Sequence, residues 1–259
     1  MIQNSFAPKL AFLASPSDRA QGALALYTQF YGQCTPEEAD VLVVLGGDGF
    51  MLNSLHIHRT LNKPFYGINF GSVGFLMNET AVQDLHSQLT NAVETVLHPL
   101  KMLALDNLGK PHTAYAINEV SVLRQSAMAA HLNIQVDGIL RLEKLVCDGI
   151  LVSTPAGSSA YNLSAHGPII PLGASLLALT PISPFRPRSW RGALLPDMAK
   201  ITISALDPDL RPINIAADSQ LFENIIKVEV SQSRSAQYRL LFNPGHNLEE
   251  RILNEQFSS

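Results

Sequence analysis

The chain has 259 residues, of which 46% are hydrophobic and 15% charged, so it can bury a core and is not typical of a disordered protein. Its 18 basic and 22 acidic residues give a net charge of −4 without any block of like charge, so nucleic acid is not an expected partner. No run of about 18 apolar residues occurs, and residues 1–14 lack the pattern of a secretory leader, so we expect a cytoplasmic protein with no membrane contact.

The first forty residues predict a strand followed by a helix. Lys9–Ala14 is a short apolar run typical of a strand. Ser17 or Asp18 can cap the helix that follows, whose apolar residues recur every three or four positions until Gly32, a residue type common at helix ends. This spacing predicts a helix that buries one face.

The next sixty residues repeat the alternation. Val41–Leu45 is a continuous apolar run, as in strands covered on both faces, and it leads into Gly46–Gly49, with a helix expected from Phe50. Pro64–Phe70 predicts another strand, and the apolar positions within 82–93 predict another helix. Alternating strands and helices indicate an α/β fold with a parallel sheet.

The pattern changes near Leu100 to short alternating runs separated by turn dipeptides. Asp106-Asn107, Asp137-Gly138 and Asp207-Pro208 each stand between such runs. Asp137-Gly138, between two strand-like runs, is a typical hairpin signal. These features predict a β-rich domain.

We therefore divide the chain into an α/β domain at 1–99, a β-rich domain at 100–240 and a C-terminal segment at 241–259. This last segment is helical in character from Asn247, which can cap a helix. Glu250, three residues later, can bond back to the cap residue as in a capping box. We expect the segment to pack back on the N-terminal domain.

The sequence GGDGF at Gly46–Phe50 lies where a buried strand meets a helix, the position at which open α/β sheets expose ligand-binding loops. Its three glycines allow the backbone to approach phosphate oxygens, and Asp48 is its only ionisable residue. A plain tight turn with a capping Asp would give the same pattern. Neither the GxGxxG nor the GxxxxGK[ST] phosphate-binding motif occurs.

Two further stretches carry polar groups suited to a nucleotide. Asn118 and Glu119 can hydrogen-bond ribose hydroxyls or a base edge, although such pairs are also common at strand edges. Asp148–Ile170 combines small residues, hydroxyls and the ring of Tyr161, as a planar ligand requires, although a closely packed helix would also use small residues. Ser158 lacks the second glycine of GxSxG, so a serine hydrolase is weakly supported.

Other candidate groups indicate little by themselves. Asp218-Ser219-Gln220 follows a strand-like run and is uninformative alone. His56 and His58, two residues apart, lie on different helix faces and do not predict a zinc site. Cys34 and Cys147 have no CxxC spacing and are expected to be reduced. A phosphate clamp, a subunit contact and a solvated loop all remain open for three arginines: Arg186, Arg188 and Arg191.

In this order, GGDG, Asn-Glu, DGILVSTPAGSSAYNLSAHGP and Asp-Ser-Gln closely resemble the motifs of the bacterial NAD kinase family, over nearly the whole chain. The resemblance implies an α/β N-terminal domain with a parallel sheet, a C-terminal β-sandwich domain and a site between them. It also implies phosphorylation of the adenosine ribose 2′-hydroxyl of NAD, with ATP or polyphosphate as donor and a divalent metal, expected to be Mg²⁺. The product implied by the resemblance is NADP.

Carried over residue by residue, the family's acid/base residue falls on Asp48, and Gly71–Leu76 resembles its glycine-rich loop. The residues implied to bind the cofactor are Gly46, Gly47, Gly49, Phe75, Asn118, Glu119, Asp148, Ala156, Ser159, Ala160, Tyr161, Asn162, Leu163, Ser164 and Gln220. No side chain is implied as a metal ligand. Departures at Phe50, Val146, Ala156 and Ser159 leave open the preference for NAD or NADH and the choice of donor.

Elementary chemistry agrees with Asp48 as the base, since a ribose hydroxyl is a poor nucleophile that a carboxylate can orient and deprotonate. Two other interpretations stay open: a lipid or sugar kinase with the same glycine turn, and a non-catalytic NADP-binding sensor. The resemblance also implies a homodimer or homotetramer.

Overall fold

The computed structural model describes residues 8–71, 74–79, 81–245, 248–255 and 257 of the chain. The chain divides into two compact units. The first contains residues 1–97 and 237–254, and the second contains residues 98–236 and 255–259. Asn247, predicted to cap the last helix, lies outside the described residues.

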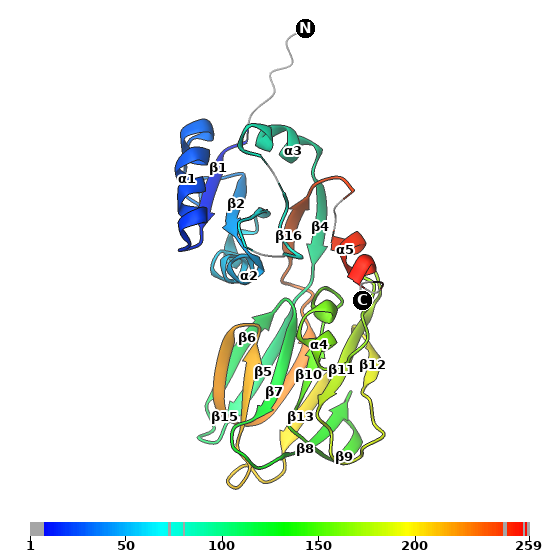
Figure 1. Ribbon diagram of the computed structural model, residues 1–259. Helices are drawn as coiled ribbons and strands as arrows, with labels where there is room; N and C mark the ends of the chain where they lie inside the picture. Colours follow the sequence, from blue (N-terminus) through cyan, green and yellow to red (C-terminus); the bar gives the residue numbers. More distant parts are fainter. Residues whose placement is uncertain (1–7, 72–73, 80, 246–247, 256, 258–259) are drawn as a thin grey trace. The chain divides into compact units, whose positions relative to one another are not determined.

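The first unit is built on a five-stranded sheet in the order β1-β2-β3-β16-β4, in which only β4 runs antiparallel to its neighbour (Figure 1). Its strands are β1 (Leu10–Ala14), β2 (Val41–Gly46), β3 (Pro64–Asn69), β4 (Val93–Leu97) and β16 (Tyr238–Phe242). Its helices are α1 (Asp18–Tyr31), α2 (Asp48–Ile57), η1 (Arg59–Leu61), η2 (Val82–Asp84), α3 (Leu85–Asn91) and α5 (Leu248–Glu255). The predicted α/β fold with a parallel sheet is confirmed.

Helix α1 follows from its sequence as predicted. The Ser17 hydroxyl accepts the N–H of Ala20 and caps the first turn, and Gly32 closes the last turn with φ of 77°, a conformation that favours glycine. The buried face carries Ala20, Ala23 and Tyr27, and it packs against β1 and β2. Strand β2 is buried along its whole length, as its continuous apolar run indicates.

Two boundaries differ from the prediction. Helix α2 begins at Asp48 rather than at Phe50, because Gly47 has the extended conformation of an N-cap. The predicted helix over 82–93 is divided between η2 and α3 and stops at Asn91, and Val93 begins β4 instead. Val93 and the next residues pair with β16, so tertiary contacts decided the local structure there.

Strand β16 was not predicted. It enters the sheet from more than 140 residues farther along the chain and lies beside β4 in Figure 1. The buried side chain of Asn78 holds its end: Nδ2 donates to the carbonyl oxygens of Gly67 and Leu241, and Oδ1 accepts the N–H of Asn243. This side chain therefore joins the end of β16 to β3 through three hydrogen bonds.

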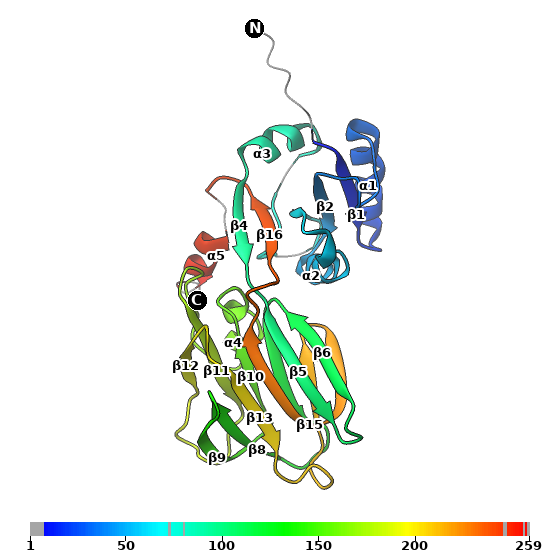
Figure 2. The same cartoon turned by 180° about the vertical axis from the view of Figure 1, so that it is seen from behind.

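Within the described residues of the second unit, eleven strands form one antiparallel sheet, in which nine lie in the order β12-β11-β10-β7-β14-β15-β13-β8-β9 and β5 joins β15 to β6 (Figure 2). The strands are β5 (Leu100–Asp106), β6 (Pro111–Ala116), β7 (Glu119–Arg124), β8 (Ala130–Val136), β9 (Ile139–Cys147), β10 (Gly149–Ser153), β11 (Leu176–Ile182), β12 (Ala193–Pro196), β13 (Ile201–Ala205), β14 (Ile213–Ala217) and β15 (Gln220–Gln232). Two short helices, η3 (Ala156–Ser159) and α4 (Tyr161–Ser164), follow β10. The sheet curls over one apolar core, which confirms the predicted β-rich domain.

The turn dipeptides behave as their residue types require. Asp137 and Gly138 have φ of 53° and 77° and form the two-residue turn of the β8–β9 hairpin. Asp106 begins the turn of the β5–β6 hairpin, where Gly109 has φ of 78°. Strands β13 and β14, on either side of Asp207-Pro208, both pair with β15 rather than with each other.

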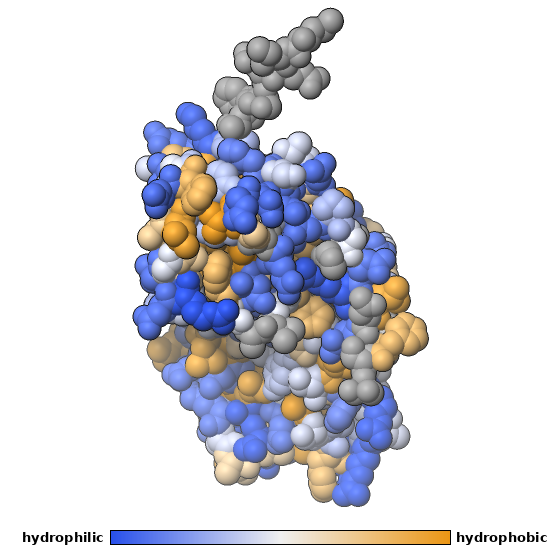
Figure 3. Space-filling model, turned by 45° about the horizontal axis from the view of Figure 1, so that its top comes forward, coloured by the Kyte–Doolittle hydropathy of each residue, from blue (hydrophilic) through white to orange (hydrophobic). Residues whose placement is uncertain are grey.

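No helix in the described part of the chain is long and apolar enough to cross a lipid bilayer. On the face shown in Figure 3, hydrophobic residues lie in small groups among hydrophilic ones. That distribution is ordinary for a protein surface exposed to water.

The bonds of Asn78 generate a prediction about stability. Asn78→Ala removes them and leaves the buried N–H of Asn243 and the carbonyl of Leu241 without this partner, so we expect the free energy of unfolding to fall by about 2–4 kcal/mol. Urea unfolding measures the change. Asn91→Ala, an exposed Asn on α3, is the matched control and should change stability by less than about 0.5 kcal/mol. Equal effects of the two substitutions would contradict the role given to Asn78.

Candidate active site

The glycine turn places a helix N-terminus at the carboxyl end of a buried parallel strand. Gly46 ends β2, Gly47 caps α2 and Asp48 is the first helical residue. The N–H groups of Asp48 and Gly49 have no acceptor within the helix, so they can bind an anion. A Cβ on Gly49 would meet no atom within 4 Å, whereas a Cβ on Gly71 would lie 3.5 Å from the Cα of Gly47. Approach to the first turn of α2 is therefore open at Gly49.

Both oxygens of the Asp48 carboxylate accept backbone N–H groups. Oδ2 lies 2.7 Å from the N of Phe75, and Oδ1 lies 2.9 Å from the N of Leu76. A Cβ on Gly74 would come within 3.0 Å of Oδ1, so this close approach suits glycine. Burial raises the pKa of Asp48, although both N–H groups and Arg251 act to lower it. Each oxygen keeps a lone pair with which Asp48 can accept a further proton.

In the second unit, Asp218 organises the Asn-Glu pair. Its carboxylate accepts the backbone N–H groups of Ile117 at 2.7 Å, Asn118 at 2.9 Å and Glu119 at 3.3 Å. The N–H of Asp218 in turn donates to the carbonyl of Glu119. A residue that looked uninformative in the sequence therefore fixes the backbone of the pair predicted to bind the cofactor.

The start of the long small-residue stretch packs directly on Asn118. Thr154 donates from its backbone N to the Asn118 carbonyl and from Oγ1 to the Ile117 carbonyl, and Oγ1 accepts the N–H of Gly157. A Cβ on Gly157 would lie 2.3 Å from the carbonyl oxygen of Asn118. Only glycine allows this approach, so the structure brings Asn118 and the predicted stretch together.

Asn162 and Ser158 hold the small-residue stretch in place through buried hydrogen bonds. The fully buried Asn162 donates to the carbonyls of Ser158 and Pro168 and accepts from the hydroxyl of Thr180 at 2.6 Å. The Ser158 hydroxyl is also buried and donates to the Pro155 carbonyl. Asn162 thus already uses its donors within the protein, and Ser158 is not placed as an exposed nucleophile.

Glu119 is the unusual group of this cluster. Its Oε2 atom is buried and has no hydrogen-bond partner among the described residues. Burial, with a smaller contribution from the nearby Asp218 carboxylate, raises the pKa of Glu119 to about 7. Burial raises the pKa of Tyr161 as well, and the negative charge of Glu119 adds to that shift. The cluster therefore contains an acceptor that lacks a donor, with the half-buried Ser159 and Tyr161 on the neighbouring stretch.

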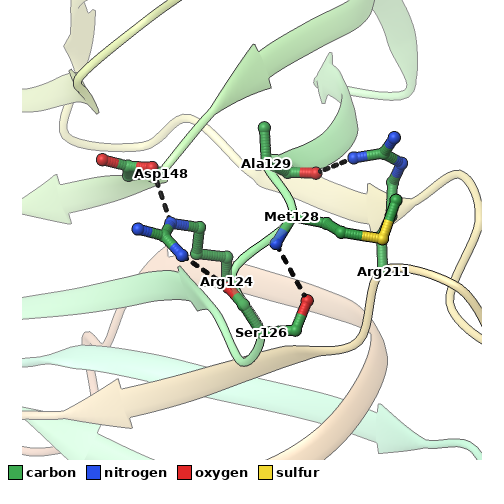
Figure 4. Close-up of polar contacts among 6 residues, drawn as sticks. All are labelled: Arg124, Ser126, Met128, Ala129, Asp148 and Arg211. Carbon is green, nitrogen blue, oxygen red and sulfur yellow. Dashed lines mark hydrogen bonds and ion pairs between the residues drawn. The ribbon is translucent and has the colours of Figure 1, made fainter.

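Asp148 is placed differently from the rest. Its carboxylate forms an ion pair with Arg124, with 2.6 Å between Oδ1 and Nε (Figure 4). Arg124 also donates to the carbonyl of Ser126. Asp148 lies just before β10 and Arg124 ends β7, and these two residues are neighbours because β7 and β10 pair antiparallel. Glu119 pairs with Ser153 at the opposite end of β10. No hydrogen bond among the described residues joins Asp148 to the Glu119 cluster, although the charge of Asp148, after burial and Glu119, also acts to raise the pKa of Tyr161.

The remaining predicted residues lie in several places. Ala156 is buried in η3, Leu163 and Ser164 lie on α4, and Gln220 is exposed at the start of β15. Phe75 is half-buried in the first unit. Part of the predicted glycine-rich loop, residues 72 and 73, lies outside the described residues.

Sequence reasoning missed the hydrogen bonds by which Asp218 and Arg251 hold the backbone of the predicted site segments. Asp218 had two signals, its position directly after a strand-like run and its place at the start of the Asp-Ser-Gln motif, but neither predicts its bonds to the backbone of residues 117–119. Arg251 had none, because it lies on the C-terminal helix, 177 and 176 residues from the carbonyls of Gly74 and Phe75 to which it donates.

Comparisons with known proteins agree with this arrangement. A family model described as the ATP-NAD kinase N-terminal domain matches residues 5–96, and one described as the ATP-NAD kinase C-terminal domain matches residues 117–240. The chain is 52% identical over 250 residues to an NAD kinase of Rhizobium meliloti (strain 1021), covering 96% of this chain and 97% of the relative. It is 50% identical over 252 residues to an NAD kinase of Xylella fastidiosa (strain Temecula1), covering 97% of each.

Two solved structures share the fold. Yeast NADH kinase complexed with NADH has a TM-score of 0.84 at 19% identity, covering 96% of this chain and 87% of that one. An NAD kinase from Archaeoglobus fulgidus in complex with ATP has a TM-score of 0.74 at 22% identity, covering 95% and 98%. Because the sequence identities are this low, the two structures show only that this chain has the same fold.

The pKa of Glu119 generates a prediction about stability and pH. The folded-state pKa of about 7 exceeds the ordinary value of 4.5, so the folded protein binds more protons between these pH values and loses stability as the pH rises through them. Glu119→Gln removes the buried charge. We expect the variant without ligand to be more stable than wild type by about 1–2 kcal/mol at pH 8, with a smaller difference at pH 5.

Urea unfolding at the two pH values measures this difference. Glu223→Gln, which changes an exposed carboxylate on β15, is the matched control and should be nearly neutral at both. If Glu119→Gln changes the free energy of unfolding equally at pH 5 and pH 8, ionisation of Glu119 does not destabilise the folded protein, and the prediction is wrong.

Proposed function

Because this chain belongs to the NAD kinase family, we propose that it transfers the γ-phosphoryl group of ATP to the adenosine ribose 2′-hydroxyl of NAD and so produces NADP. The observation that carries the proposal is Asp48: a carboxylate of raised pKa, fixed by two N–H groups, at the N-terminus of a helix. One element thus offers a base and a place for phosphate.

Asp48 acts as the general base. The ribose hydroxyl donates a hydrogen bond to a free lone pair of the carboxylate, and its proton passes to that oxygen as the O–P bond forms and the bond to the leaving ADP breaks. The raised pKa makes Asp48 a better proton acceptor than an exposed Asp, and such proton transfer contributes about 10²–10⁴-fold to a rate. The N–H groups of Phe75 and Leu76 fix the direction of the carboxylate.

The glycine turn binds phosphate oxygens of the donor. Gly46–Phe50 contains no lysine, so backbone N–H groups of the first turn of α2 supply the hydrogen bonds. In the described residues, no group of three or more His, Cys, Asp or Glu side chains could hold a metal ion. We expect the divalent metal, Mg²⁺ by resemblance to the family, to enter with ATP as its complex, because this ion is commonly bound by substrate phosphates and water.

The cluster around Asn118 and Glu119 binds the dinucleotide. The Oε2 atom of Glu119, which has no partner among the described residues, accepts a hydrogen bond from a ribose hydroxyl or an amino group. This bond replaces the hydrogen bonds to water that the oxygen loses on burial. The Tyr161 ring and the small residues beside it offer a flat apolar surface for a base. Asp218 keeps the backbone of the pair in place.

The direct test is formation of NADP. Purified protein is incubated with NAD and MgATP, and NADP is detected with an NADP-specific dehydrogenase. We expect NADP with ATP, and parallel reactions with polyphosphate and with NADH define the donor and acceptor preferences. No NADP with either donor would overturn the proposal, and phosphorylation of a sugar or lipid instead would favour the other kinase interpretation.

Asp48→Asn tests the role of the base. The amide cannot take up the proton, so we expect kcat to fall by about 10²–10⁴-fold. Asn keeps only one of the two oxygens that accept the N–H groups of Phe75 and Leu76, so the substitution also removes one hydrogen bond. The Kd for NAD and the melting temperature are therefore measured alongside kcat. Asp84→Asn, an exposed carboxylate in the same unit, is the control and should keep wild-type turnover. Wild-type kcat in Asp48→Asn would remove Asp48 from the mechanism.

A further inference from the structure

Arg251 and Asp48 bind opposite sides of the same two peptide groups. The Nη1 atom of Arg251 lies 2.7 Å from the carbonyl oxygen of Gly74 and 3.1 Å from that of Phe75. The N–H groups of Phe75 and Leu76, which belong to the same two peptide groups, donate to Asp48. A trans peptide group is planar, with its C=O and N–H pointing in opposite directions, so fixing one end fixes the other.

The rest of α5 holds the guanidinium in place. Leu248 and Ile252 on this helix are fully buried, and the guanidinium carbon of Arg251 lies 5.7 Å from the ring centre of the buried Phe242. Arg251 also donates to the carbonyl of Met77. The side chain is thus anchored in the first unit on one side and bound to the 74–77 segment on the other.

We propose that Arg251 is a positioning residue for Asp48, which it orients through the two peptide groups between Gly74 and Leu76. The arginine touches no reacting atom in this scheme. It sets the direction of two N–H groups, and its positive charge on the carbonyl side makes these groups stronger donors to the carboxylate. The catalytic consequence rests on the proposed function, whereas the orientation of the segment does not.

The charges around the pair support a measurable effect on pH dependence. Among the described residues, Arg251 is the charged group that acts to lower the pKa of Asp48, and Glu79 interacts with Arg251 in turn. Removal of the guanidinium charge should therefore raise the pKa of Asp48 further. The carboxylate would then be protonated at higher pH, and the acid limb of the kcat/KM profile would shift to higher pH.

Two variants test the proposal. Arg251→Met removes the donors and the charge, and Arg251→Gln removes the charge but keeps an amide donor. We expect kcat to fall at least about tenfold in Arg251→Met, with KM for NAD and ATP within about twofold, because the base is misdirected while the ligand contacts stay. The acid limb should move to higher pH in both variants, which a purely structural role would not cause.

Amide hydrogen exchange gives a readout that does not need activity. In Arg251→Met the amides of Phe75 and Leu76 should exchange at least about tenfold faster than in wild type, and in Arg251→Gln by less. The matched control is Arg239→Met, which breaks an ion pair between Arg239 on β16 and Glu94 on β4 and should leave kcat, the pH profile and this exchange unchanged. Thermal melting shows whether each variant is folded.

The outcomes separate the two proposals. Wild-type exchange at Phe75 and Leu76 in folded Arg251→Met would overturn the role of Arg251, whatever the activity. An unshifted acid limb in Arg251→Gln would overturn it as well, even if Arg251→Met fails to fold. Absence of NADP formation by the wild-type protein would overturn the proposed function, and the exchange experiment would still decide whether Arg251 orients the segment.

Discussion

Carboxylates that accept backbone N–H groups fix the shape of both units where the predicted functional residues lie. Asp48 accepts two consecutive N–H groups from the 75–76 backbone, and Asp218 accepts three from 117–119. Such bonds are charge-assisted and stronger than those between neutral groups. They also act on the backbone, so they hold a loop in one conformation without using the side chains of that loop. The bonds to Asp218 do not involve the side chains of Asn118 and Glu119, which we propose bind the ligand.

The same arrangement explains why glycine recurs in these segments. The Asn118 carbonyl approaches Gly157 too closely for a Cβ, and a Cβ on Gly74 would crowd the Met77 side chain at 2.9 Å and the Asp48 carboxylate at 3.0 Å. Gly49 has open space around its Cα instead. Glycine at the first two positions therefore serves internal packing, whereas at Gly49 it leaves room next to the first turn of α2. The three positions look alike in the sequence, and only the structure separates these two uses.

Much of the fold could be predicted because it depends on local patterns. The capped helix after Ser17, the buried run at Val41–Leu45 and the hairpin turn at Asp137-Gly138 all carry their physical cause in adjacent residues. Strand β16 could not be predicted in the same way, because its pairing with β3 and β4 depends on residues more than 140 positions away. The order of the motifs identified the site segments through a family resemblance. Asp218 belongs to one of these motifs, but the sequence does not show that its carboxylate accepts backbone N–H groups of residues 117–119. Arg251 lies in no motif and contacts its segment through backbone carbonyls.

Among the residues predicted to bind the cofactor, the hydrogen bonds of each side chain distinguish those that hold the backbone from those that keep an unpartnered polar atom. Asn162 lies in the middle of the predicted stretch, yet its donors and its oxygen are already engaged by Ser158, Pro168 and Thr180, so its main effect is to hold the stretch. Glu119 has the opposite character, with a buried oxygen that lacks a donor and a pKa raised to about 7. A buried acceptor without a partner costs free energy in the unliganded protein. In the proposed function, a ligand hydroxyl or amino group that donates to Glu119 would offset this cost, so the unpartnered oxygen would favour ligand binding.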